Sequence, residues 1–163
     1  MKGKAEQYRI IDEMIRTAQF FRNKTVRYWT ENQGVKLVDI YKQCAIMAKE
    51  FESAGKLNST ARQASAERAI FAIQRFFADC KAKKPGKKGY PKFKKHTRSV
   101  EYKQSGWSLS TDKRCLTFKD GFAAGKFKLI GSRDLHFYAP DEMRANQTCA
   151  SCRRILPTIL HQH

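Results

Sequence analysis

Two cysteines near the end of the sequence, Cys149 and Cys152, have the C-x-x-C spacing of half a zinc site. A tetrahedral site needs two further ligands, and His161 and His163 follow at a spacing that is unusual for zinc. We therefore interpret the pair as a remnant without metal, keep zinc as the alternative, and expect no other cofactor. The other cysteines fall on apolar helix faces or beside a strand and are interpreted as core residues: Cys44, Cys80 and Cys115.

A metal-dependent nuclease would need a cluster of carboxylates that holds divalent ions and activates water. The second half of the chain offers only scattered ones: Glu101, Asp112, Asp120, Asp134, Asp141 and Glu142. Asp112 and Asp120 occur in sequences typical of turns, and Asp120 directly precedes Gly121. A Cys–His nucleophile pair has no local support either. The sequence therefore predicts that the chain is not an enzyme by itself.

The most distinctive chemical feature is a basic segment, residues 81–98, which holds nine Lys or Arg and no Asp or Glu. It lies in a chain whose 33 basic and 15 acidic residues leave a net charge of +18. Lysines that neutralise phosphates release counterions, and exposed rings stack on unpaired bases. The composition and the interleaved rings together predict a nucleic-acid-binding surface.

The residues that we expect on this surface are basic or aromatic: Lys83, Lys84, Lys87, Lys88, Tyr90, Lys92, Phe93, Lys94, Lys95, Arg98 and the nearby Trp107. The alternative is a solvated linker that its rings anchor to the sheet. Three arginines earlier in the chain either extend the same surface or form an ordinary solvent-exposed face: Arg62, Arg68 and Arg75.

An anionic membrane is the other partner that so much positive charge suggests. No apolar run approaches the ~18–20 residues of a spanning helix, and the first residues lack the apolar stretch of a secretory signal. The five cysteines form an odd, scattered set, which is not typical of a disulfide framework. We expect a cytoplasmic protein with no membrane contact.

The elements that must position the basic segment change character near residue 81. Apolar residues step by three and four through 8–29, 37–51 and 59–80, which predicts three amphipathic helices. Gly55 is expected to end the second helix in a left-handed cap, and Asn58 or Ser59 to cap the third. Later apolar residues alternate in four short stretches: 100–103, 116–119, 126–129 and 135–138. The predicted class is α+β, a three-helix bundle followed by a small antiparallel sheet or open barrel.

The order of these features is itself distinctive. Helices that end with Phe76-Phe77 precede the run Gly89-Tyr90-Pro91-Lys92-Phe93-Lys94-Lys95, and Ser99-Val100-Glu101-Tyr102 follows. This order resembles TnpB, the OrfB-type protein of insertion-sequence transposons, which is related to type V CRISPR effector nucleases. Residues 126–135 resemble the family's later wedge strands. The resemblance extends from about Tyr8 to Met143.

In TnpB proteins a helical recognition lobe is inserted into an OB-like wedge barrel, and a RuvC-like domain cuts DNA with metal ions. The resemblance implies a recognition-like bundle over residues 1–80, a basic loop over 81–98 and a wedge-like module over 99–143, whose starting strand is short or absent. Residues 144–163 resemble the first half of the family's zinc ribbon. The chain thus looks like an internally deleted copy that lacks the nuclease domain.

The function that follows is that of the RNA- and DNA-binding portion of a TnpB-like protein, without nuclease activity. Its expected partners are a structured guide RNA and target DNA, and it would compete for the guide with a full-length relative. An independent helix-turn-helix regulator, which binds duplex DNA as a dimer, is the alternative. A third reading is an enzyme whose site is completed by another chain or by a longer frame.

Overall fold

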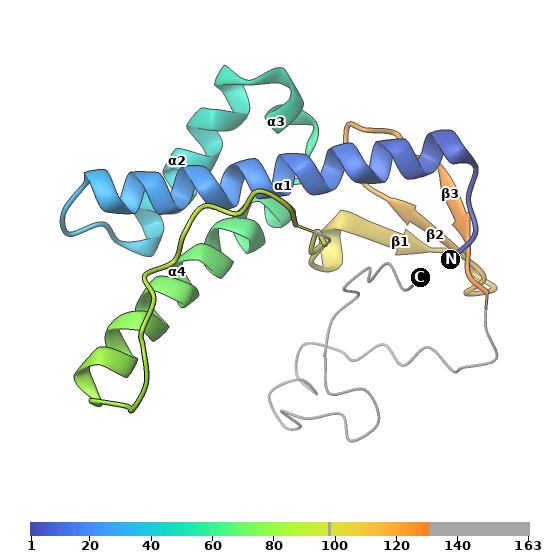
Figure 1. The fold of residues 1–163 in the computed structure, drawn as a ribbon. Coiled ribbons are helices and arrows are strands. Elements are labelled where there is room, and N and C mark those ends of the chain that lie inside the picture. Colours follow the sequence, from blue (N-terminus) through green and yellow to red (C-terminus); the bar gives the residue numbers. More distant parts are fainter. Residues whose placement is uncertain (98, 131–163) are drawn as a thin grey trace.

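The computed structural model describes residues 1–97 and 99–130, and the predicted α+β class is confirmed (Figure 1). Four helices come first: α1 (Ala5–Glu31), α2 (Leu37–Glu50), α3 (Glu52–Lys56) and α4 (Ser59–Lys81). A 3-10 turn (Gln104–Gly106) then leads into strands β1 (Trp107–Leu109), β2 (Cys115–Phe118) and β3 (Lys126–Lys128). None of the described helices combines the length and the apolar character that a membrane span requires.

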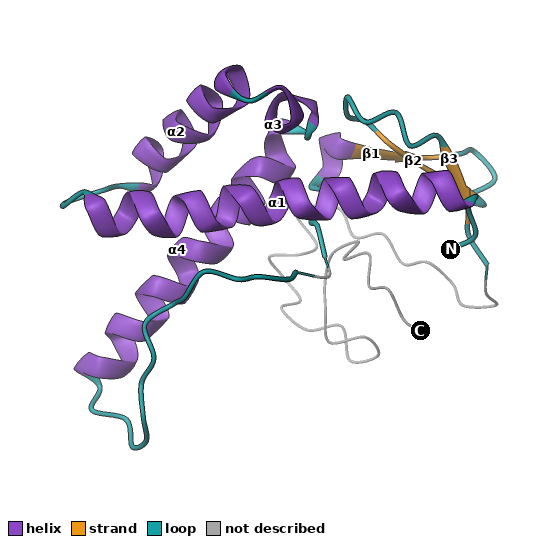
Figure 2. Cartoon of the chain, turned by 45° about the horizontal axis from the view of Figure 1, so that its top comes forward, coloured by secondary structure: helices purple, strands orange, loops and turns teal. Residues whose placement is uncertain are grey.

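Helix α1 is the longest element; α3, α4 and the sheet pack against it, whereas α2 packs mainly against α3 and α4 (Figure 1). Its buried stripe includes Ile11, Met14, Ala18 and Phe21, which recur every three or four residues as an amphipathic helix requires. The sheet covers its N-terminal end, whereas α2, α3 and α4 lie nearer its C-terminal half. Figure 2 shows α2 and α3 on the opposite side of α1 from the basic segment that follows α4.

The chain enters α1 from a short bridge to the sheet. The main chains of Lys2 and Lys128 exchange two hydrogen bonds, with N–O distances of 2.7 and 3.1 Å. Gln7 adds two bonds from its side-chain amide to the carbonyls of Ala124 and Lys126, at 2.7 and 3.1 Å. A single bridged pair therefore stands where the TnpB resemblance led us to expect a short or missing first strand.

The predicted left-handed cap at Gly55 is wrong. The chain breaks instead at Phe51, which is extended, and then forms the additional helix α3, which contains Gly55. A Cβ atom at residue 55 would lie 2.8 Å from the carbonyl oxygen of Ala48, so a close approach of two helices accounts for the glycine. Asn58 caps α4 as predicted, accepting from the main-chain N–H of Thr60 at 2.9 Å.

The three strands form an antiparallel sheet in the order β1-β2-β3. Two of the predicted stretches are confirmed, because Leu116 and Phe118 in β2 and Phe127 in β3 point their side chains into the core. Strand β1 was not predicted, since Trp107-Ser108-Leu109 is too short to show an alternation. The predicted strand at 135–138 lies outside the described residues.

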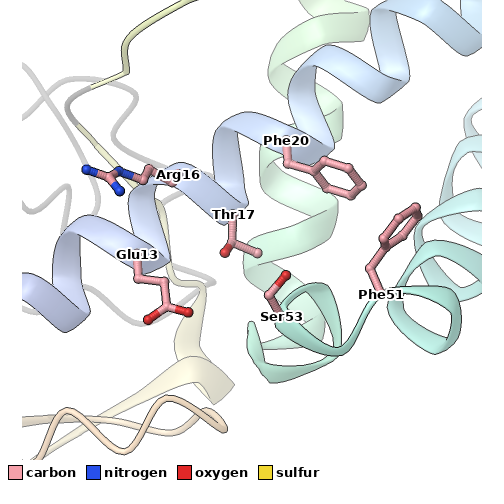
Figure 3. A pocket seen from close by; sticks show the side chains of 6 residues that line it. All are labelled: Glu13, Arg16, Thr17, Phe20, Phe51 and Ser53. Atoms are coloured by element: carbon pink, nitrogen blue, oxygen red, sulfur yellow. The ribbon is translucent and has the colours of Figure 1, made fainter.

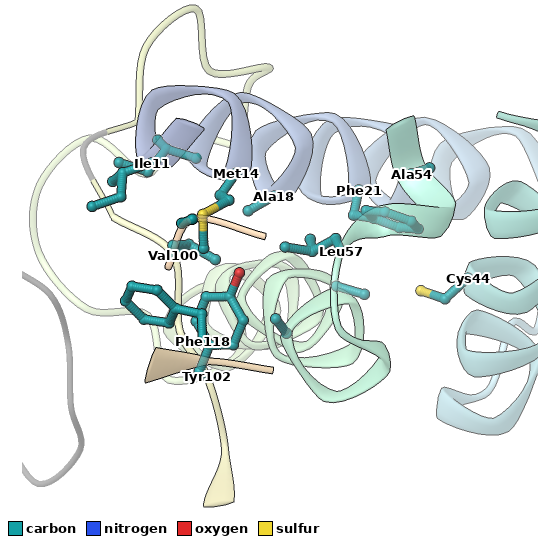
Figure 4. Close-up of a cluster of buried hydrophobic side chains, with 14 of the residues drawn as sticks. Ile11, Met14, Ala18, Phe21, Cys44, Ala54, Leu57, Val100, Tyr102 and Phe118 are labelled. Atoms are coloured by element: carbon teal, nitrogen blue, oxygen red, sulfur yellow. The ribbon is translucent and has the colours of Figure 1, made fainter. Parts of the chain in front are cut away.

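One hydrophobic core joins the helices to the sheet (Figure 4). Val100 and Tyr102, ahead of the 3-10 turn, are each 1% exposed and lie between α1 and the sheet. The Tyr102 ring packs on Phe118 with centroids 5.0 Å apart. Its hydroxyl donates to Asp120 at 2.5 Å, and burial together with this bond raises the tyrosine's pKa. The division into a bundle and a wedge-like module remains a prediction.

Helix α4 extends beyond this core, which corrects one part of the predicted apolar stripe. Ile70 and Ile73 are buried, but Phe77 is 53% exposed and Cys80 is exposed on the last turn. The final turns of α4 project away from the sheet, and none of the other described helices lies against them (Figure 1). Cys44 is buried as predicted, whereas Cys115 is only half-buried.

Candidate nucleic-acid interface

Side chains of α1 hold the main chain of the basic segment. Asn23 makes a paired contact with Lys94, because its amide donates to the Lys94 carbonyl at 2.8 Å and its oxygen accepts from the Lys94 N–H at 3.0 Å. Gln19, one turn earlier, donates to the carbonyls of Lys94 and Lys95, both at 2.9 Å. Side chains of α1 thus satisfy main-chain donors and acceptors of the segment that a neighbouring strand would satisfy in a sheet.

Two further contacts extend this attachment in both directions. Arg22 donates to the carbonyl of Lys92 at 3.2 Å, and the Thr97 hydroxyl donates to Gln19 at 3.3 Å. Arg22 is only 9% exposed, and its burial lowers the pKa of the guanidinium. Most of these bonds therefore join side chains of α1 to main-chain carbonyl and N–H groups of the segment, and the lysine side chains of the segment take no part in them.

The side chains of the attached stretch remain exposed as a result. Lys92, Lys94 and Lys95 are all exposed, and the Phe93 ring is 59% exposed. Because the main chain is held, the points at which these three lysine side chains project from the surface are fixed. A polyanion that meets them does not have to order the backbone, which lowers the entropic cost of binding.

Tyr90 anchors the segment, but to α4 and α1, and not to the sheet as the alternative had it. Its half-buried ring meets Phe76 and Phe77 edge-on, with centroids 5.4 and 6.4 Å away, and its hydroxyl lies 3.5 Å from that of Thr30. These contacts tie the segment to the projecting end of α4. Among the predicted rings, Phe93 is thus the exposed one on the segment.

The first part of the segment, residues 81–89, turns around the end of α4. Lys83, Lys84 and Lys87 are exposed and Lys88 is half-buried. Lys84 pairs with Asp79 at 2.5 Å, and this bond is the main reason that the pKa of Asp79 is lowered. Lys84 is therefore partly neutralised within the chain. A shallow depression of about 310 Å³ is lined by several of these cations together with Arg75 and Phe76.

Arg68 joins the residues that follow the basic segment to α4, and its ion pair makes it a structural residue and not an extension of the basic surface. Its guanidinium contacts one carboxylate oxygen of Glu101 at 3.0 and 3.2 Å and the Ser99 hydroxyl at 3.3 Å. Lys103 makes a second link of this kind to Glu67, at 2.9 and 3.0 Å. The sequence did not reveal these pairs, since the partners are more than 30 residues apart.

The remaining predicted residues fall elsewhere. Trp107 belongs to β1 and packs half-buried against the core, so it is a residue of the sheet and not of the basic segment. Arg62 is half-buried near Cys44, and burial lowers the pKa of its guanidinium. Arg98 and the pair Cys149 and Cys152 lie outside the described residues.

Three of the carboxylates that we considered as metal ligands are described, and each has a structural partner. Glu101 pairs with Arg68, Asp112 accepts from Ser110 and from the main-chain N–H of Arg114 in a turn, and Asp120 accepts from Tyr102. Within residues 1–97 and 99–130, no three His, Cys, Asp or Glu side chains gather closely enough to hold a metal ion. Asp134, Asp141 and Glu142 lie outside those ranges. No protein-family model and no curated protein sequence matches this chain.

Proposed function

We propose that this chain binds nucleic acid through residues 92–95. The observation that supports the proposal is the attachment of Lys94 by both its N–H and its carbonyl to Asn23, which leaves three neighbouring lysines exposed. An ordinary solvated linker has no need of such contacts. Because α1 fixes the main chain of this cationic segment, the spacing of its lysines is fixed too. Such an arrangement suits a ligand whose negative charges are regularly spaced.

The sugar-phosphate backbone is that ligand. Each lysine that approaches a phosphate releases condensed counterions, so affinity depends steeply on salt. The exposed Phe93 ring can stack on an unpaired base, a contact that any base provides. The large net charge of +18 brings a polyanion to the chain before these specific contacts form.

Within this proposal, the chain is the RNA- and DNA-binding portion of a TnpB-like protein and acts in the cytoplasm without cutting DNA. The motif at 89–95, on which the resemblance depends most, coincides with the stretch that α1 holds. Structured guide RNA and target DNA would be its ligands. A chain with these contacts and no nuclease domain would compete with a full-length relative for the guide.

A competition experiment tests this function. Labelled structured RNA is bound to the full chain at low ionic strength, and unlabelled RNA or palindromic duplex DNA is added. We expect the RNA to displace the label at lower concentration than the duplex. Stronger displacement by one palindromic sequence would favour the helix-turn-helix regulator, and a chain that binds neither polymer would refute the proposal. Incubating DNA, guide RNA and magnesium with the chain tests the absence of cleavage.

A further inference from the structure

A second depression, of about 280 Å³, lies between α1 and the junction of α2 with α3 (Figure 3). The rings of Phe20 and Phe51 form one wall, with centroids 5.2 Å apart and planes inclined by 68°. Thr17 and Ser53 bring hydroxyl groups to its floor, and Glu13 stands one turn before Thr17. The depression therefore combines an aromatic wall with hydrogen-bonding groups and one carboxylate.

The position of this depression relates it to the basic segment. Arg16, which also lines it, lies three residues before Gln19 and four before Phe20. Residues three and four apart are neighbours on a helix surface, so Arg16 lies between the face that holds the segment and the face that carries the rings. A polynucleotide bound along the segment would meet Arg16 next and then the depression.

The cations around the rings favour a nucleotide over an apolar side chain as the occupant. The Lys24 ammonium lies 5.5 Å from the centroid of Phe20 and 5.6 Å from that of Phe51. Lys24 over the two rings and Arg16 in the lining thus provide positive charge near the path of a phosphate. Glu13 would repel a phosphate inside the depression, so the backbone has to stay at the rim and only a base can enter.

We propose that this depression receives an unpaired nucleobase, which stacks on Phe51 and is read by Glu13. The inference rests on the proposed function, because it assumes a nucleic acid along residues 92–95. A carboxylate only accepts hydrogen bonds, and it can accept two side by side. Guanine presents two adjacent donors on its Watson–Crick edge, whereas the single ring donor of uracil lies between two carbonyl oxygens. The depression should therefore prefer guanine.

The test uses two single strands, an oligouridine and the same strand carrying isolated guanines, and a duplex of equal length. Fluorescence anisotropy measures the affinity of the full chain for each. We expect the guanine-bearing strand to bind roughly fivefold or more tightly than oligouridine, as a bidentate base contact would give. Glu13→Gln should bring this ratio close to one. The ratio is the readout because loss of a negative charge raises the affinity for every strand.

Glu50→Gln is the matched control, since Glu50 is an exposed acid directly before Phe51 and does not line the depression. It should leave the guanine ratio unchanged. Phe51→Leu keeps an apolar contact with Phe20 but removes the stacking face. We expect it to weaken single-strand binding roughly fivefold or more and to leave duplex binding unchanged.

The outcomes separate this inference from the proposed function. A wild-type chain that binds RNA but shows no guanine preference would overturn the guanine reading. A preference that Glu13→Gln retains would do the same, as would a duplex that competes equally with single strands. In each of these cases nucleic-acid binding by residues 92–95 would still stand. A chain that binds none of the three probes would instead remove the proposed function.

Discussion

Replacing Asn23 by alanine removes no charge but weakens the attachment of the basic segment to α1. The substitution deletes the two hydrogen bonds to Lys94, at 2.8 and 3.0 Å. At about 0.5–1.5 kcal/mol each, and nearer the lower value because they are exposed, the attached conformation loses about 1–2 kcal/mol. If binding requires that conformation, affinity falls by up to about 5- to 30-fold. The contacts of Gln19 and Arg22 persist and limit the loss.

Titration of labelled RNA at several salt concentrations measures this effect. Because every lysine is retained, Asn23→Ala should lower affinity at each salt concentration without changing the slope of log affinity against log salt. Asn32→Ala is the matched control, since the amide of Asn32 bonds only locally, to the Tyr28 carbonyl in the same helix. Wild-type affinity for Asn23→Ala would refute the reasoning that the attachment positions the lysines. Equal losses in both variants would refute it too.

Three other predictions concern stability and reactivity. Arg68→Ala should lower the free energy of unfolding in urea by about 1–3 kcal/mol, because Glu101 keeps a largely buried carboxylate without its partner, and Arg68→Lys should cost less. Burial and the bond to Glu67 raise the pKa of Tyr41 to about 12. The stability that the protonated tyrosine contributes below pH ~10 should therefore be lost as the pH rises toward 12. Thermal unfolding across this pH range should show a smaller loss of stability for Tyr41→Phe. A thiol reagent followed by peptide mapping should label exposed Cys80 well before Cys44, whose pKa burial raises to about 11.

The helices followed from the sequence more reliably than the strands. Apolar residues at three- and four-residue steps persist over many turns in α1 and α4, so their period is unambiguous. A strand of three residues such as β1 shows no period at all. The stripe on α4 was followed too far because periodicity indicates which face is apolar, but not whether a neighbour covers it, as Phe77 and Cys80 illustrate.

The basic segment was found from composition, but its attachment was not. Gln19, Arg22 and Asn23 have the spacing of one helix face and flank the buried stripe, which is the only sequence signal that they contact another element. Their partners are main-chain atoms some 70 residues away, and main-chain atoms leave no trace in residue types. Charge and aromatic residues can therefore predict a binding surface, but the contacts that hold its main chain are known only from the structure.

The central claim is that lysines on the attached stretch contact phosphates, and the salt dependence of RNA binding tests it most directly. The triple variant Lys92→Gln, Lys94→Gln, Lys95→Gln is compared with a variant in which three exposed lysines away from both the segment and the depression of Figure 3 are changed likewise: Lys36, Lys42 and Lys113. Both variants lose three charges, but Lys36 and Lys42 lie just before and within α2, on the far side of α1 in Figure 2, and Lys113 lies in the turn before β2. For a single strand the first variant should flatten the log–log slope by about two units, and the second should change it little. Equal slopes in the two variants would contradict the claim.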